Sequence, residues 1–196
     1  MKISNAPCRI KGFTLIELMI TVAIAAVLLL VAIPSLNSFQ RNAELTSIAN
    51  KVIGSISAAR GEAMKRGMNA VVVPLDNGSS WSAGWAAFVD KANNQTYDSS
   101  ATGIVAIQEA IPSGITVVGN GTAGESAPYI MFDASGFSRT KSSGFGALTL
   151  KIQRTDVATD DQPGQTRIVI VSSTGRVRVC KPASATDANC KDTLTQ

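Results

Sequence analysis

The feature that most constrains this chain is an almost unbroken apolar run near its N-terminus. Between Phe13 and Ile33 the only polar side chains are those of Thr14, Glu17 and Thr21. A run of about 20 residues is long enough to cross the hydrocarbon core of a bilayer as a helix. A buried core helix is the alternative, but such helices are usually shorter and amphipathic. The run therefore predicts a transmembrane helix.

Three positive charges precede the run. Because Lys2, Arg9 and Lys11 lie on its N-terminal side, the positive-inside rule places the N-terminus in the cytoplasm and the remainder outside. A secretory signal would be cut after its apolar region, at a site of small residues. Here the run continues past Pro34 into a helical pattern without a persuasive site of that kind. The pattern predicts a single-pass protein of an inner membrane.

Composition excludes several classes of function. Histidine is absent, which removes His-based triads, general bases and metal ligands. There is also no phosphate-binding glycine loop, no metal-ligand spacing and no nucleophile–base pair. We therefore expect no enzyme, no cofactor and no metal. A loop exposed to solvent is expected to hold three aspartates whose spacing matches no calcium loop: Asp156, Asp160 and Asp161.

The net charge of +4 depends on the first twelve residues. Without the three cations there, 15 of the 18 Lys and Arg remain against 14 Asp and Glu, so the rest of the chain is nearly neutral. Basic character is local instead, with eight Lys and Arg against three Asp between Phe137 and Lys181. No global positive field predicts a nucleic-acid partner.

After Pro34 the apolar residues recur at helical spacing. They form one stripe: Leu45, Ile48, Val52, Ile56, Ala59 and Ala63. Polar residues fall off it: Glu44, Lys51, Ser55, Glu62 and Lys65. Gly67 is a plausible stop signal. We expect one helix over about residues 13–66, kinked or loosened at Pro34.

Short β-type runs separated by turn residues follow from residue 70. The expected strands are Ala70–Leu75, Gly84–Val89, Ile104–Ile107, Ile115–Val118, Tyr129–Phe132, Ala147–Gln153, Thr166–Val171 and Arg176–Cys180. One long helix followed by many strands predicts an α+β head with antiparallel sheet packed on the amphipathic half of the helix. Trp81 and Trp85 are expected to pack in the core or at its edge.

Of the three cysteines, one lies before the apolar run and two lie after it. Cys8 precedes the run, whereas Cys180 and Cys190 lie beyond it, in a compartment where disulfides persist. A bond between Cys180 and Cys190 would close an eleven-residue loop and contribute about 2.5–3 kcal/mol by chain-entropy arithmetic. It would also pin the C-terminal tail.

The segment Lys11-Gly12-Phe13-Thr14-Leu15-Ile16-Glu17-Leu18 resembles the leader junction of type IV pilins and type II secretion pseudopilins. The resemblance implies cleavage between Gly12 and Phe13 by a prepilin peptidase, followed by N-methylation of Phe13. It also implies that Glu17 pairs with the N-terminal amine of a neighbouring subunit during assembly. A carboxylate in an apolar helix costs roughly 2.5–3.5 kcal/mol and so needs a partner. The alternative is that Glu17 lies at headgroup depth.

Further motifs narrow the resemblance to the FimT/GspH family of minor pilins and H-type pseudopilins. They are Ala59-Arg60-Gly61-Glu62-Ala63-Met64-Lys65-Arg66, then Trp81-x-x-Gly84-Trp85-x-x-Phe88-x-Asp90, then Gly175-Arg176-Val177-Arg178. The resemblance implies a type IV pilin-like fold. It divides the chain into a cleaved leader at 1–12, a transmembrane and filament-core half-helix at 13–40, and a periplasmic or extracellular head at 41–196.

The C-terminal hairpin is the candidate binding surface. On its second strand Arg176, Arg178 and Cys180 share one face and Val177 and Val179 the other. Paired guanidiniums suit phosphate, and the segment is similar to the Gly-Arg-x-Arg element of DNA-binding minor pilins. This implies sequence-independent DNA contact by Arg176, Arg178 and Lys181. The alternative is a solvated strand face.

The functional hypothesis is a minor pilin at or near the tip of a type IV pilus on the cell surface, and the binding hypothesis adds DNA capture in natural transformation. The alternative is a minor pseudopilin of a type II secretion system without a DNA role. Both imply other pilins as partners through the N-terminal helix. The leader does not separate the two machines, because they share the peptidase.

Overall fold

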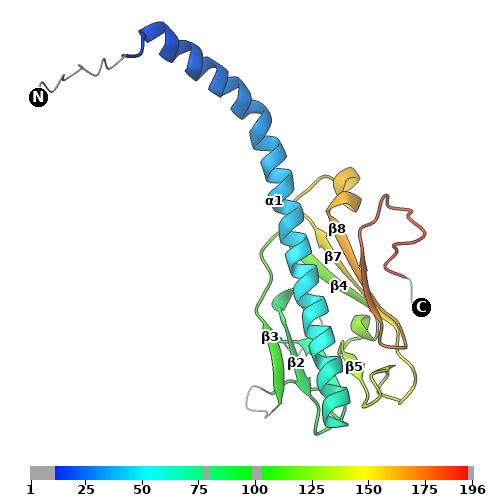
Figure 1. The fold of residues 1–196 in the computed structure, drawn as a ribbon. Coiled ribbons are helices and arrows are strands. Elements are labelled where there is room, and N and C mark those ends of the chain that lie inside the picture. Colours follow the sequence, from blue (N-terminus) through cyan, green and yellow to red (C-terminus); the bar gives the residue numbers. More distant parts are fainter. Residues whose placement is uncertain (1–11, 77–79, 99–102, 194–196) are drawn as a thin grey trace, which may run out of the picture. The chain divides into compact units, whose positions relative to one another are not determined.

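The computed structural model describes residues 12–76, 80–98 and 103–193, without the side chains of residues 31–35. The chain divides into two compact units, Met1–Gln40 and Arg41–Gln196 (Figure 1). The second unit has the residue bounds given above for the head, and the location of the head outside the membrane stays a prediction. The predicted leader at 1–12 lies, apart from Gly12, outside the described residues.

Helix α1, Leu15–Arg66, is the principal helix of the fold. It begins two residues after the predicted start and ends at the predicted residue, where Gly67 adopts a φ of 65°. The kink expected at Pro34 falls among residues whose side chains are not described and stays a prediction. Within the described part of the chain, no helix combines the length and the apolar character that a membrane crossing requires.

The apolar stripe on the second half of α1 is buried as predicted, from Leu45 to Ala63. Ser55 was expected off the stripe, but it is buried as well. Its hydroxyl oxygen accepts a hydrogen bond of 3.0 Å from the Trp85 indole nitrogen. The periodicity identified the buried face of α1 correctly. It did not predict the burial of Ser55, because the hydrogen-bond partner Trp85 is distant in sequence.

Two antiparallel sheets form the head, in the strand orders β3-β2-β1-β5-β6 and β4-β7-β8-β9. The first sheet contains β1 Ala70–Pro74, β2 Trp85–Val89, β3 Ile104–Gln108, β5 Ile130–Phe132 and β6 Ser138–Arg139. The second contains β4 Ile115–Gly121, β7 Leu148–Arg154, β8 Thr166–Val171 and β9 Val177–Cys180. Short 3-10 turns are η1 Trp81–Ala83, η2 Thr122–Gly124, η3 Thr159–Asp161 and η4 Pro163–Gln165.

All eight predicted strands are present, with ends that differ by up to three residues. Strand β6 was not predicted, because two residues are too few to show an alternating pattern. The predicted α+β class with an antiparallel head is confirmed.

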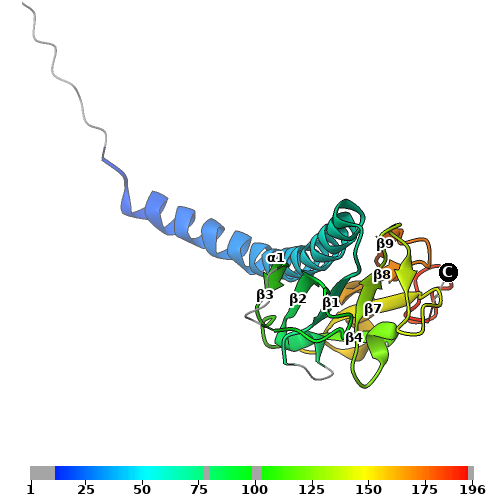
Figure 2. The same cartoon turned by 90° about the horizontal axis from the view of Figure 1, so that it is seen from below.

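The main core lies between the second half of α1 and one face of each sheet (Figure 2). Trp81 and Trp85 are 2% and 1% exposed, which confirms that both are core residues. The opposite face of the first sheet carries a second apolar cluster that includes Phe88, Tyr129 and Met131. The opposite face of the second sheet carries a third, formed by Ile168, Ile170 and Cys190. Both outer faces are therefore partly covered rather than open to solvent.

Candidate functional site

The first turn of α1 carries the predicted assembly residue, Glu17. Its Oε2 accepts hydrogen bonds of 3.1 Å from both the backbone N–H and the hydroxyl of Thr14. In return, the Glu17 N–H donates to the Thr14 hydroxyl at 3.2 Å. This reciprocal arrangement is a capping box, with Thr14 as N-cap and Glu17 three residues on.

The capping box gives the Glu17 carboxylate a partner that sequence reasoning overlooked, although the Thr-x-x-Glu signature was visible. It occupies one carboxylate oxygen. Among the described residues no hydrogen bond to Oε1 is found, so that oxygen has room for a second donor. Gly12 and Phe13 are exposed immediately before the helix, where a peptidase would have to reach them.

The basic hairpin is formed by β8 and β9, with Ile168 opposite Cys180 and Ile170 opposite Arg178. Arg178 and Cys180 therefore share the outer face with these isoleucines. Val177 packs against the main core, whereas Val179 is 44% exposed. Arg176 lies one residue before β9, so it belongs to the turn rather than to the strand. Its carbonyl accepts from the Ser172 N–H at 3.0 Å, which closes that turn.

Most basic side chains of the C-terminal third are engaged by other groups. Five of the eight have such partners: Arg139 pairs with Asp133, Lys141 donates to the Ala127 carbonyl, Lys151 pairs with Asp192, Arg154 pairs with Glu44 and Asp156, and Arg167 donates to Asn42 and Thr46. The Arg154 pair also corrects the expectation that Asp156 is merely solvated, and it holds the pKa of Asp156 below its usual range.

The three remaining cations are the predicted ones. Within the described part of the chain, the side chains of Arg176, Arg178 and Lys181 have neither a hydrogen bond nor an ion pair. Arg176 and Lys181 are exposed and Arg178 is half-buried. A ligand phosphate would therefore not have to displace an internal carboxylate.

The C-terminal tail is fixed beside these cations. Cys180 and Cys190 form the predicted disulfide, with Cα atoms 5.9 Å apart. The Asp192 carbonyl accepts hydrogen bonds from the side chains of Asn120 and Thr149, and its carboxylate pairs with Lys151 at 3.1 Å. The tail is thus held by polar contacts to β4 and β7 as well as by the disulfide.

Arg60 positions the hairpin turn, a role that the sequence did not reveal. Its Nε donates to the Gly136 carbonyl at 2.8 Å and its Nη2 to the Thr174 carbonyl at 3.3 Å. Gly175 adopts a φ of 79°, and a Cβ there would meet the Gly136 oxygen at 2.1 Å. The turn that carries Arg176 is therefore clamped between α1 and the β5–β6 loop. Both Arg60 and Gly175 belong to the motifs quoted above, but their contact is long-range.

These features define a class, a pilin-type subunit with an N-terminal helix and an antiparallel head. The profile described as "Prokaryotic N-terminal methylation motif" matches residues 8–33. The profile of the family described as "Type II transport protein GspH" matches residues 49–175, more than half of the chain. The chain therefore belongs to the GspH family, and the predicted FimT/GspH resemblance is confirmed.

The fold is shared with a solved structure of low sequence identity. The type IV minor pilin FimU of Pseudomonas aeruginosa strain PAO1 aligns with a TM-score of 0.52 at 18% identity, covering 74% of this chain and 98% of that chain. The minor pseudopilin EpsH of the type 2 secretion system of Vibrio cholerae aligns with a TM-score of 0.47 at 16% identity, covering 72% and 99%. None of the curated protein sequences matches this chain. The two profile matches make the chain a subunit of the pilin and pseudopilin type.

Proposed function

We propose that this chain is a minor pilin of a type IV pilus, located in or near the tip, and that it binds DNA without sequence preference for uptake in natural transformation. It would be inserted in the inner membrane with its head in the periplasm, cut by the prepilin peptidase after Gly12, and carried to the cell surface in the filament. Other pilins would bind it through the N-terminal helix.

The observation that carries the DNA role is the set of three unpaired cations on one clamped hairpin. Arg176, Arg178 and Lys181 lack internal partners within the described residues, whereas the neighbouring basic side chains have them. Guanidinium groups contact phosphate through two donors at once, and a fixed turn loses little conformational entropy on binding. Contacts of this kind reach the backbone of DNA rather than its bases.

A second candidate is a minor pseudopilin of a type II secretion system, with a structural role and no DNA contact. The observation in its favour is the family itself, which is described as a type II transport protein. Deletion of the gene distinguishes the two. A pilus role predicts loss of pili and of transformation with secretion intact, whereas a pseudopilin role predicts loss of exoprotein secretion with pili intact.

DNA contact is tested by titrating the full-length chain, in detergent micelles, with a fluorescent 20-base-pair duplex. The logarithm of affinity should fall with that of salt concentration, with a slope of roughly −0.9 per phosphate contact, so two or three contacts predict about −2 to −3. Arg176→Gln combined with Arg178→Gln should lower affinity at least tenfold and flatten the slope. The melting temperature should stay nearly unchanged, because neither side chain forms a hydrogen bond or an ion pair within the described residues.

The matched control removes two positive charges from α1 instead of from the hairpin. Lys51→Gln combined with Lys65→Gln changes exposed residues of α1 and leaves the hairpin intact. It should bind DNA as the wild type does. If the two double variants titrate alike, the hairpin is a solvated strand face, and any DNA affinity of the chain reflects net charge alone.

A further inference from the structure

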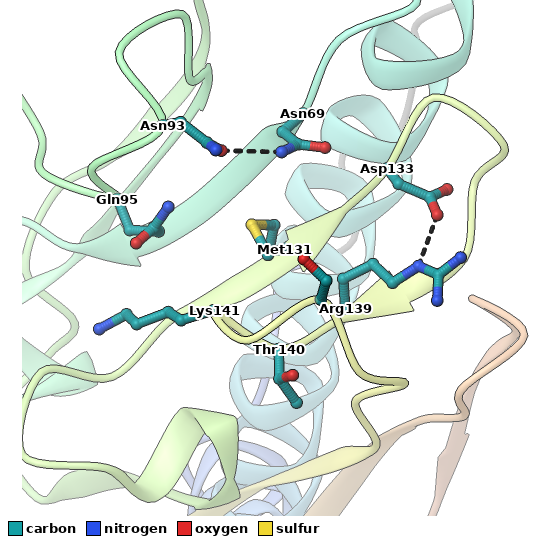
Figure 3. Close-up of a pocket in the computed structure, with 9 residues that line it drawn as sticks. Asn69, Asn93, Gln95, Met131, Asp133, Arg139, Thr140 and Lys141 are labelled. Atoms are coloured by element: carbon teal, nitrogen blue, oxygen red, sulfur yellow. Dashed lines mark hydrogen bonds and ion pairs between the residues drawn. The ribbon is translucent and has the colours of Figure 1, made fainter.

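A polar pocket lies on the outer side of the first sheet, and its lining does not include Arg176, Arg178 or Lys181. It has a volume of about 330 Å³ and is bordered by β5, β6, the loop after β2 and the loop after β6. Figure 3 shows polar side chains around Met131, with Asn69 and Asn93 on one side, Gln95 and Lys141 on another, and Asp133 and Arg139 opposite. A volume near 300 Å³ suits one small ligand.

Backbone strain is concentrated at this pocket. Among the described residues, three that are not glycine have a positive φ: Asn93 at 56°, Gln95 at 54° and Ser143 at 65°. All three line this pocket. Left-handed conformations at such residues cost on the order of 1 kcal/mol each and gather at ligand sites. Glycine would be unstrained at each position, and the side chains of Asn93 and Gln95 form hydrogen bonds with Asn69 and Asp90.

The lining is unusual for a ligand pocket because it is almost wholly polar. Met131 is the one apolar residue among the nine described residues of the lining. Three of the others are carboxamides, which carry both a donor and an acceptor, and the amide nitrogen of Gln95 already donates to Asp90 Oδ2 at 3.2 Å. Asn69 and Asn93 are joined by a hydrogen bond of 2.8 Å from Nδ2 to Oδ1, which leaves the oxygen of Asn69 and the nitrogen of Asn93 for a ligand. Such groups match the hydroxyls of a sugar.

The pocket also carries a net positive charge. Both oxygens of Asp133 are already occupied, by the N–H groups of Ser135 and Phe137 and by Arg139 Nε at 2.6 Å. Burial favours the neutral acid, but these hydrogen bonds outweigh it and hold the pKa of Asp133 below its usual range. Asp133 therefore orients Arg139.

Arg139 and Lys141 are the two cations of the pocket. The Arg139 guanidinium lies 4.2 Å from the centre of the Phe145 ring, and no hydrogen bond to its terminal nitrogens is found in the described part of the chain. Lys141 Nζ lies 4.5 Å from the centre of the Tyr129 ring, and its one hydrogen bond within the described residues is a long one, 3.4 Å, to the Ala127 carbonyl. Two cations against one occupied carboxylate favour a ligand that carries a single negative charge.

We propose that this pocket binds an acidic sugar, a hydroxylated ring bearing one carboxylate, with the carboxamides on its hydroxyls and Lys141, which lies on the same side as Gln95, on its carboxylate. Such rings occur in surface polysaccharides, which a subunit exposed near a filament tip would meet. The proposal does not rest on the DNA role of the hairpin.

The test is saturation-transfer NMR on the full-length chain in detergent micelles, with three acidic sugars as probes: D-glucuronate, D-galacturonate and N-acetylneuraminate. At least one should bind saturably, and D-glucose and acetate should each bind at least tenfold more weakly. Absence of saturable binding by all three acidic sugars overturns the proposal. Displacement of a bound sugar by a DNA duplex at equal concentration also overturns it, since the pocket would then belong to a DNA surface.

Two variants keep the test independent of folding. Asn93→Gly retains the positive φ and removes the amide, so it should lower affinity about tenfold without lowering the melting temperature. Lys141→Gln should reduce the affinity for the acidic sugar at least tenfold and leave that for D-glucose unchanged. Lys51→Gln, the same change on an exposed position of α1, should have no effect, nor should Arg176→Gln combined with Arg178→Gln. Wild-type affinity in both pocket variants contradicts the proposal.

Discussion

At the scale of single residues, the two carboxylate oxygens of Glu17 can serve two roles at once, helix capping and subunit assembly. One carboxylate oxygen closes a capping box with Thr14, which stabilises the first turn of α1. The other oxygen is without a hydrogen bond among the described residues. We propose that the N-terminal amine of a neighbouring subunit binds there, as the leader resemblance implies. The cap would then fix the carboxylate before the neighbour arrives.

Two substitutions separate capping from assembly. Glu17→Val should enter the membrane normally, yet its amount in sheared filaments should fall at least tenfold, because the amine loses its partner. Thr14→Val removes the capping hydroxyl but keeps the carboxylate. Loss of a cap costs about 0.5–2 kcal/mol, so this variant should assemble nearly normally. Immunoblots of membrane and filament fractions give both values. Equal incorporation of the two variants would mean that Glu17 acts only as a cap.

At the scale of elements, the β8–β9 turn is held by contacts that span the sequence. The hydrogen bonds of Arg60 to Gly136 and Thr174 join residues 76 and 114 positions apart. Ser138 adds a backbone bond to the Ser173 carbonyl at 3.0 Å. The turn is therefore a fixed part of the head, and its geometry depends on the absence of a side chain at Gly175.

The same substitution at two glycines should have opposite effects on stability. Gly175→Ala places a Cβ at a positive φ and 2.1 Å from a backbone oxygen, so it should destabilise the head by about 1–3 kcal/mol. Gly61→Ala falls in the exposed interior of α1 with nothing within 4 Å, and it should stabilise by about 0.5–1 kcal/mol. Urea denaturation measures both. Equal changes in the free energy of unfolding for the two variants would contradict the claim that the β8–β9 turn requires glycine at position 175.

Local patterns predicted most of the elements. The apolar stripe identified the buried face of α1, the glycine at 67 marked its end, and short β-type runs between turn residues located eight of the nine strands in the described part of the chain. Long-range features were not predictable in this way. The Arg60 clamp, the Ser55–Trp85 hydrogen bond and the pocket around Met131 each join residues from separate elements, so no local window contains them. The three cations were identified, but their lack of partners was visible only in the structure.

At the scale of the whole molecule, the two units differ in where their apolar side chains lie. Large apolar side chains between Phe13 and Phe39 are exposed throughout the described part of the first unit. In the second unit they are buried in a core to which both sheets contribute. An extended apolar surface marks a site of association with membrane or protein. This division suits a subunit whose N-terminal helix binds other subunits while its folded head is presented outside.

The measurement that tests the central claim most directly is mass spectrometry of the chain recovered from sheared filaments. A processed subunit should begin at Phe13, carry one methyl group on its N-terminal amine and lack Met1–Gly12. Gly12→Val should keep the leader and remain in the membrane fraction, because the peptidase would no longer recognise the junction. A chain that begins at Met1 in assembled filaments would contradict the account.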